Sequence, residues 1–192
     1  GYGSDPEPLA AIGNTLYFAA SVHPYGRELW KTDGTVNGTV MVKDIITGSA
    51  AGNSGIGEYI SSGKIIANGN TLYFVADDGT NGVELWKSDG TAAGTVMVKD
   101  IRSGSSSSYP SQLTAIGNTI YFMANDFTNG YELWKSDGTS SGTVMVKDIR
   151  SGGYSGLSAT SITAIGNSVY FSADDGTNGI ELWKSDGTAS GT

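Results

Sequence analysis

Short apolar segments separated by polar turns recur four times along the chain. In the third repeat, the apolar segment Leu113 to Ile116 is followed by a Gly-Asn turn and by the β-branched and aromatic segment Thr119 to Ala124. Tyr131 to Lys135 and Thr143 to Ile149 continue the pattern after polar loops. Segments of this composition bounded by turn residues are typical of β-strands. We therefore predict four strands in each repeat.

The alternation within these strands is imperfect in an informative way. Leu133 and Trp134 are adjacent, as are Tyr121 and Phe122, so neighbouring apolar side chains point to opposite faces of a strand. Both faces of each unit must then be covered, and a unit of about 50 residues with two apolar faces stacks on its neighbours as a propeller blade does. The predicted fold class is all-β, with tandem four-stranded repeats forming a β-propeller or an open propeller-like stack.

The spacing of the repeats sets the domain organisation. We predict a single repeat domain, 1–192, made of four units at about 1–48, 49–104, 105–153 and 154–192, with a Gly/Ser-rich loop from Ala50 to Gly63. The last unit stops at Thr192, before its own fourth strand, so we expect an open sheet edge. Unpaired edges are templates for another strand. We therefore expect the chain to pair with copies of itself or with adjacent repeats.

A sequence motif within each unit carries a resemblance to a known family. The motif ELW-x-x-DGT-x-x-GT begins at Glu28, Glu84, Glu132 and Glu181. It resembles the signature of the bacterial ELWxxDGT tandem-repeat family of large secreted or surface proteins, and the match covers essentially the whole chain. The resemblance implies a propeller-like repeat region that is extracellular or on the cell surface. It implies no catalytic residues.

Composition and charge exclude several classes of partner. The formal net charge is −8, and the 11 lysines and arginines occur singly, so no face can neutralise many phosphates. We expect no nucleic-acid partner. No apolar run approaches the roughly 20 residues that a transmembrane helix needs, so we expect no transmembrane segment. The absence of cysteine excludes disulfides and thiolate metal sites.

Acidic loops favour a calcium site in two of the four repeats. Each loop places two carboxylates and an amide oxygen within six residues, and hard oxygen ligands on a tight glycine-containing loop suit calcium. The first and third repeats lack this pair of carboxylates, so a plain polar turn is the alternative. The candidate ligands are Asp77, Asp78, Asn81, Asp174, Asp175 and Asn178.

Two further sets of repeated residues have alternative interpretations. Aromatic rings on repeated units can line sugar-binding pockets, although a tryptophan beside a leucine in mid-strand is also typical of core packing; these residues are Trp30, Trp86, Trp134 and Trp183. Aspartate followed by glycine forms tight turns, and we predict structural turns at Asp33, Asp89, Asp137 and Asp186. The repeated glutamates are expected to pair with a lysine or a backbone amide.

The function predicted from these features is that of a non-enzymatic extracellular structural or assembly module. His23 is the only histidine, and no nucleophile motif accompanies it. Near-identical units indicate selection for stacking, whereas an active site usually makes one unit deviate. We expect part of a larger surface protein or fibre. The alternative is a propeller binding module on the cell surface, lectin-like or protein-binding.

Overall fold

The computed structural model of the chain describes residues 3–47, 55–56, 65–157 and 161–192. Every regular element in these ranges is a β-strand, and the strands form four antiparallel sheets. The prediction of an all-β fold built from four-stranded repeats is therefore confirmed. The predicted loop from Ala50 to Gly63 lies almost entirely outside the described residues.

Each sheet is a meander in which every strand pairs with the next strand along the chain. The first sheet holds β1 (Glu7–Ile12), β2 (Thr15–Val22), β3 (Gly26–Thr32) and β4 (Val40–Lys43). The second holds β5 (Ile65–Asn68), β6 (Thr71–Asp77), β7 (Val83–Ser88) and β8 (Val96–Lys99). The third holds β9 (Ser111–Ile116), β10 (Thr119–Asn125), β11 (Tyr131–Ser136) and β12 (Val144–Lys147). The fourth holds β13 (Thr163–Ile165), β14 (Ser168–Asp174) and β15 (Ile180–Ser185).

The outermost strand of each complete sheet is shorter than the sequence predicts. In the third sheet it spans Val144–Lys147 instead of Thr143 to Ile149. Thr143 leaves the strand because its hydroxyl donates to the carbonyl of Thr139 in the preceding turn. Ile149 leaves it because its N–H donates to the carboxylate of Glu132. Both ends of the strand are therefore bounded by side-chain hydrogen bonds that compete with the ladder.

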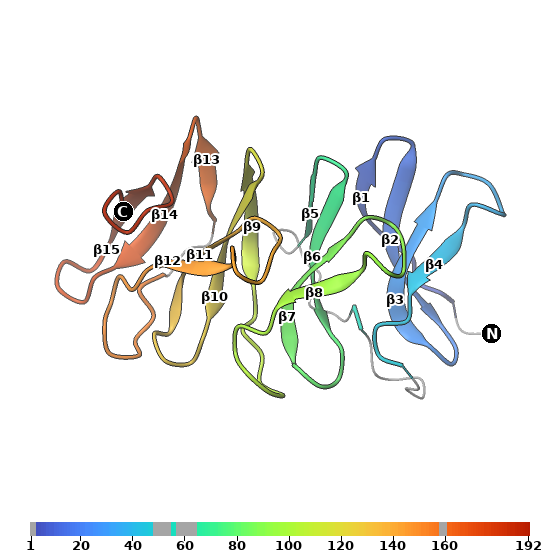
Figure 1. The fold of residues 1–192 in the computed structure, drawn as a ribbon, viewed down its shortest axis with the longest axis horizontal. Helices are drawn as coiled ribbons and strands as arrows, with labels where there is room; N and C mark the ends of the chain where they lie inside the picture. The colour runs from blue at the N-terminus through green and yellow to red at the C-terminus, as the bar shows by residue number, and fades with distance from the viewer. Residues whose placement is uncertain (1–2, 48–54, 57–64, 158–160) are drawn as a thin grey trace.

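The four sheets, which we call blades, stand side by side in one row (Figure 1). The first strands of neighbouring blades, β1, β5, β9 and β13, lie next to one another along the row. The two termini lie at opposite ends of it, as Figure 1 shows. The arrangement is therefore an open propeller-like stack in which the first and fourth blades each have only one neighbouring blade.

The core lies between the blades and not within them. Leu133 packs with Val169 and Phe171 of the fourth blade, whereas the adjacent Trp134 packs with Leu85 of the second blade. Burying a leucine or phenylalanine side chain contributes about 1.5 to 3 kcal/mol. The expectation that both faces of a unit are covered therefore holds for the interior blades, and stacking supplies most of the buried apolar surface.

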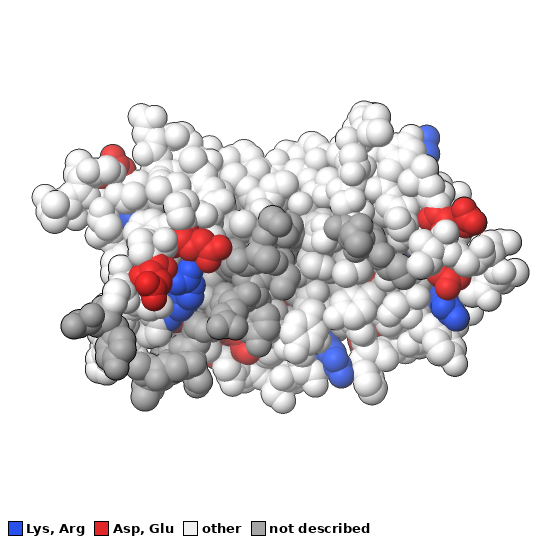
Figure 2. Space-filling view, turned by 180° about the vertical axis from the view of Figure 1, so that it is seen from behind, with Lys and Arg blue, Asp and Glu red and all other residues white. Residues whose placement is uncertain are grey.

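Charged side chains lie scattered over the surface. Figure 2 shows lysine and arginine as small separate groups on one side of the molecule, some of them next to carboxylates. Arg27 and Glu7 form an ion pair at 2.8 Å. The described residues contain no helix with the length and apolar character that a membrane span requires.

Candidate functional site

The candidate site is the outward side of the fourth blade, which no other described part of the chain covers. In the pairing of β14 with β15, Tyr170 lies opposite Lys184, Ser172 opposite Leu182 and Asp174 opposite Ile180. Because alternate residues of a strand share one face, Ile180, Leu182 and Lys184 project from the same side. We call the group Tyr170, Ile180, Leu182 and Lys184 the fourth-blade face. Leu182 is 77% exposed and Ile180 is 63% exposed.

The equivalent leucines of the other blades show what such a face contacts when it is covered. Leu29, Leu85 and Leu133 are each 0% exposed. Each of them lies in the core that its blade forms with the next blade. Leu182 thus exposes an apolar surface that every other copy of the repeat buries. Large exposed apolar groups in one patch mark interaction sites more often than isolated ones do.

A lysine hydrogen bond accompanies the leucine at each internal junction. The Nζ atoms of Lys31, Lys87 and Lys135 donate to glycine carbonyl oxygens of the next blade, at 2.7, 2.7 and 2.8 Å. The acceptors are Gly90, Gly138 and Gly187, each in a DGT turn. Lys184 is the fourth member of this series, and no described residue accepts from it. The fourth-blade face therefore carries an unused donor beside its exposed leucine.

Buried glutamates bind the segments that connect one blade to the next. Glu28, Glu84 and Glu132 are each 0% exposed. Their carboxylates accept backbone N–H groups from the start of the connector at 3.0 to 3.2 Å, from Ile45, Ile101 and Ile149. They accept a second set of N–H groups further along it at 2.8 to 3.3 Å, from Gly55, Ser108 and Gly156. The expected pairing with a backbone amide is thus found, but its source is the connector and not the neighbouring strand.

Burial controls the ionisation of these three carboxyl groups. Desolvation raises the pKa of Glu28, Glu84 and Glu132 from the ordinary 4.5 to about 7, and the N–H donors oppose it. Glu181, the fourth member of the series, is exposed, and no described residue donates to it. Identical motifs therefore place the same carboxyl group in two environments.

A pocket of about 370 Å³ opens beside Glu181 at the start of β15. It is lined by Asp175, Asn178, Gly179, Glu181, Leu182 and Trp183. Three of the lining side chains are polar, those of Asp175, Asn178 and Glu181, and two are large and mostly apolar, those of Leu182 and Trp183. In the third blade, the equivalent carboxylate of Glu132 receives the connector N–H of Gly156 at 2.8 Å. The pocket thus lies where an internal blade binds a backbone segment.

The first blade presents the complementary surface at the other end of the row. We call its outward residues Leu16, Phe18 and Trp30 the first-blade face. Leu16 is exposed, at 37%, and Phe18 and Trp30 are partly buried. Their equivalents in the second blade are buried in the core with the first blade: Leu72, Phe74 and Trp86. A Cβ atom at Gly90 would collide with the hydroxyl of Tyr17 in the preceding blade, whereas one at Gly34 would meet nothing within 4 Å. The first-blade face lacks the neighbour that its equivalents have.

The candidate sugar-binding tryptophans lie in inter-blade contacts. Trp86 and Trp134 are 5% and 6% exposed. Nζ of Lys43 lies 5.8 Å from the centre of the Trp86 ring, and Nζ of Lys99 lies 5.9 Å from that of Trp134. This placement leaves no exposed ring at these two positions on which a sugar could stack. The sugar prediction is left with the partly buried Trp30 and Trp183 at the two ends.

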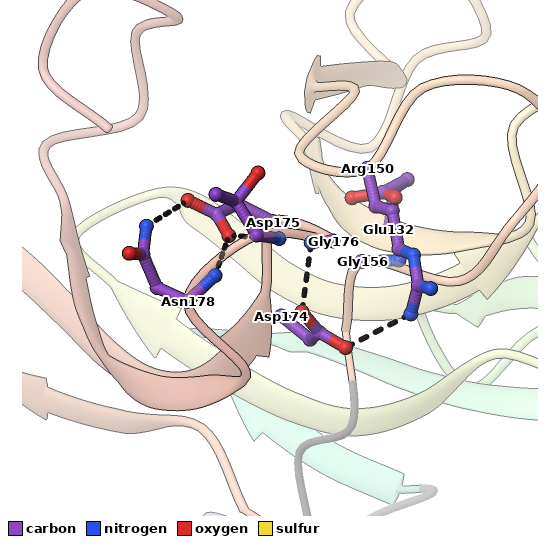
Figure 3. Close-up of polar contacts among 8 residues, drawn as sticks. Glu132, Arg150, Gly156, Asp174, Asp175, Gly176 and Asn178 are labelled. Carbon is purple, nitrogen blue, oxygen red and sulfur yellow. Dashed lines mark hydrogen bonds and ion pairs between the residues drawn. The ribbon is translucent and has the colours of Figure 1, made fainter.

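The candidate calcium loops use their carboxylates to hold their own backbone. The Asp175 carboxylate accepts the backbone N–H groups of Thr177 and Asn178 and the side-chain amide of Asn178, at 2.7 to 2.8 Å (Figure 3). Asp174 accepts from Gly176 and forms an ion pair with Arg150 at 2.9 Å. The residues Asp77, Asp78 and Asn81 make the same loop bonds in the second blade.

The third blade makes this loop without the first aspartate. Asn125 occupies the position of Asp77, and its side-chain oxygen accepts the N–H of Phe127. Asp126 and Asn129 repeat the remaining bonds. Within the described ranges, no three acidic or histidine side chains converge in a way that could hold a metal ion. The calcium site stays a prediction, and the loop bonds give it no support.

The aspartates of the DGT turns make one set of bonds in all four blades. In the third blade, the Asp137 carboxylate accepts the backbone N–H of Thr139 at 2.8 Å and its hydroxyl at 2.7 Å. These hydrogen bonds lower the pKa of the Asp137 carboxyl group, and the bond from the Thr139 hydroxyl has the largest effect. Gly138 follows with a φ of +86°, which glycine adopts without strain. The same geometry recurs at Asp33, Asp89 and Asp186.

Comparisons with known proteins show a similarity of fold only. No protein-family model matches the chain, and no curated protein matches it. A crystal structure of puromycin hydrolase aligns with a TM-score of 0.54 at 14% identity, over 97% of this chain and 28% of the hydrolase. An α-L-arabinofuranosidase from Clostridium thermocellum aligns with a TM-score of 0.37 at 17% identity, over 97% of this chain and 70% of that protein. The chain thus spans less than a third of the hydrolase, and the likeness supports a propeller-like fold.

The prediction that the chain is not an enzyme is contradicted by this comparison. A fold similar to that of the chain occurs in a hydrolase, so neither the fold nor its repetition is evidence against catalysis. The physical reason is that a scaffold of stacked blades leaves its loops and connectors free to carry unrelated side chains. Equivalence of the four blades therefore says nothing about the residues that such a scaffold can present. At 14% identity, the likeness also transfers no activity to this chain.

Proposed function

We propose that the chain is a structural repeat module that assembles by stacking blades face to face, as part of a larger extracellular protein or fibre. The observation that carries the proposal is the exposure of Leu182, 77%, against 0% for the same leucine in the other three blades. This leucine is buried wherever the repeat has a following blade, and the removal of apolar area from water is the main favourable term in association. The exposed copy is therefore expected to bind a further blade. The resemblance to ELWxxDGT proteins supports the extracellular setting.

Mass determination over a range of concentrations tests this proposal. Sedimentation velocity and electron microscopy of the purified chain are expected to show mass that grows with concentration, as rows of blades. Head-to-tail contacts between identical units give rings when the rotation closes and filaments when it does not. A monodisperse monomer at every concentration up to the millimolar range contradicts the proposal.

A matched pair of variants assigns the effect to the face. Leu182→Asp places a charge on the fourth-blade face and is expected to abolish the growth in mass. Phe127→Asp is the control, because Phe127 is equally exposed, at 74%, but lies in a loop of the third blade. Aspartate also tolerates the φ of +74° at this position better than phenylalanine does. Equal loss of association in both variants contradicts a role of the face.

A binding module is the second candidate, favoured by the pocket beside Glu181. An aromatic ring, an amide and two carboxylates line it, and such a combination suits a small polar ligand. Thermal unfolding in the presence of a panel of glycans tests this function. A ligand at one hundred times its dissociation constant stabilises the folded chain by about 2.7 kcal/mol. Absence of any stabilisation across the panel removes the lectin-like alternative.

A further inference from the structure

The first residues of the described chain repeat the conformation of an internal connector. The segment Ser4-Asp5-Pro6 corresponds in the repeat to Ser108-Tyr109-Pro110. The carbonyl of Ser108 accepts the N–H of Asn125 at 2.9 Å, and the carbonyl of Ser4 accepts the equivalent N–H, that of Ser21, at 2.7 Å. The next residues also agree, since φ is +49° at Tyr109 and +41° at Asp5. The segment is therefore docked on its own blade as a connector is.

The other side of an internal connector binds the preceding blade. The N–H of Ser108 donates to Glu84 at 3.0 Å, and its hydroxyl donates to the same carboxylate. The N–H of Tyr109 donates to the carbonyl of Val83 at 3.3 Å. The N–H and hydroxyl of Ser4 are the equivalent donors, and within the described residues they have no acceptor. Ser4 is exposed, whereas Ser108 is 0% exposed.

The matching acceptors are unused at the other end of the row. Glu181 is the equivalent of Glu84, and the carbonyl of Ile180 is the equivalent of that of Val83. No described residue donates to the Glu181 carboxylate, which opens into the pocket beside it. Since the two ends lie at opposite extremes of the row, they cannot meet within one chain in this arrangement (Figure 1).

We propose that a second copy of this chain docks head to tail on the fourth blade, with its Ser4 N–H and hydroxyl donating to Glu181. The inference rests on the stacking function proposed above and names its partner and its contact. The first-blade face of the incoming copy covers Leu182, and its Gly34 carbonyl accepts from Lys184 as Gly90 accepts from Lys31. Asp5 N–H pairs with the carbonyl of Ile180. Every group in this junction repeats one that the chain already makes between its own blades.

The polarity of the contact allows a test with two blocked chains. Leu182→Asp blocks the fourth-blade face of one chain, and Leu16→Asp blocks the first-blade face of the other. Each variant alone is expected to be a monomer, and an equimolar mixture is expected to form a 1:1 dimer that grows no further. A dimer formed by either variant alone overturns head-to-tail docking, because it requires a contact between two like faces.

A double-mutant cycle in this dimer tests the Ser4–Glu181 contact itself. Ser4→Ala is made in the chain that carries Leu182→Asp, and Glu181→Gln in the chain that carries Leu16→Asp. A hydrogen bond to a charged group contributes enough binding free energy that its loss is expected to raise the dissociation constant about tenfold for each change. The double change is expected to cost little more than either single change, because both remove one interaction. Ser140→Ala, at an exposed turn of the third blade, is the control and is expected to leave the constant unchanged.

The outcomes separate this inference from the proposed function. Absence of any association in the wild-type chain and in the mixture overturns both. A 1:1 dimer whose dissociation constant is unaffected by Ser4→Ala and Glu181→Gln overturns the docking contact and leaves stacking intact. Ser4 and Glu181 are both exposed, so neither change is expected to disturb the fold. The two changes are therefore also measured in the chain without the Leu182→Asp and Leu16→Asp substitutions. There, association is expected to require a concentration about tenfold higher in each variant.

Discussion

The third and fourth blades carry nearly the same sequence, YELWKSDGT and IELWKSDGT, in different surroundings. Leu133 and Glu132 are 0% exposed, while Leu182 is 77% exposed and Glu181 is exposed as well. The strand pairing is the same, with Phe122 opposite Trp134 and Phe171 opposite Trp183. Local structure is thus set within each blade, whereas burial is set by the next blade. Repeat proteins divide their stability in this way between intrinsic and interface terms.

Truncating the two leucines is expected to give the largest difference between the blades. Leu133→Ala removes a side chain from a packed inter-blade core and is expected to lower the free energy of unfolding by about 2 to 5 kcal/mol. Leu182→Ala changes an exposed side chain and is expected to alter it by less than about 0.5 kcal/mol in the monomer. Urea denaturation at a concentration where the chain is monomeric measures both. Similar losses in the two variants would mean that the fourth blade is covered within one chain.

Alanine substitutions at the turn glycines test the same inter-blade contacts, because the glycine of one blade lies against a tyrosine of the preceding blade. Gly138 and Gly34 have φ values of +86° and +90°, so alanine pays about 1 kcal/mol at either position for backbone strain. Only at Gly138 does the new Cβ collide with the hydroxyl of Tyr73 in the preceding blade. We expect Gly138→Ala to lower the free energy of unfolding by about 2 to 3 kcal/mol, because overpacking against Tyr73 adds to the backbone strain.

Removing the opposing hydroxyl provides a rescue for this prediction. Tyr73→Phe combined with Gly138→Ala is expected to recover part of the loss, because the colliding atom is the tyrosine oxygen. Thermal unfolding of the single and double variants measures the coupling. Equal losses for Gly34→Ala and Gly138→Ala would show that backbone strain alone accounts for both.

The buried glutamates predict a dependence of stability on pH. The pKa of Glu84 is about 7 in the folded chain and lies near 4.5 when the side chain is in water, so between these values the folded chain binds more protons than the unfolded chain. The resulting stability is present below about pH 4.5 and is lost as the pH rises through about 7. Each of the three glutamates is expected to contribute on the order of 1 to 3 kcal/mol to this loss.

Glutamine substitutions identify the groups responsible for the pH dependence. Glu84→Gln is expected to reduce the fall in free energy of unfolding between pH 5 and pH 8 by roughly one third, since three such groups act together. Glu181→Gln is the matched control at the exposed equivalent, and we expect a smaller change there in the monomer. Chemical denaturation at several pH values gives the slopes. An unchanged slope in Glu84→Gln would assign the dependence to the surface charges instead.

The inter-blade lysines are expected to give the smallest effect. Lys135→Met removes the bond to the Gly187 carbonyl while keeping the apolar stem, and is expected to cost about 1 kcal/mol because the group is only partly buried. Lys184→Met has no bond to lose in the monomer and is expected to leave its stability within about 0.5 kcal/mol. Its effect is expected in the association assay. A stability loss at Lys184 equal to that at Lys135 would contradict the difference between the blades.

Periodicity alone predicted the all-β class and a stack of repeated four-stranded units, but not the exact bounds of the outermost strands or the choice between a closed propeller and an open row. The reason is that alternation and turn residues act over a few residues, and adjacent apolar pairs such as Leu133 and Trp134 already require two covered faces. The chemistry of the DGT turns is equally local, because Asp137 bonds Thr139 two residues on.

Only the tertiary structure decided which copies of the motif are exposed. Four equal ELW motifs predict four equal environments, yet the connector that covers Glu132 comes from 24 residues further along the chain, at Gly156. The fourth-blade face and the unused donors of Ser4 depend on which blade follows which in space. They could not be inferred from the motif, because a side chain's burial is a property of its neighbours and not of its own sequence.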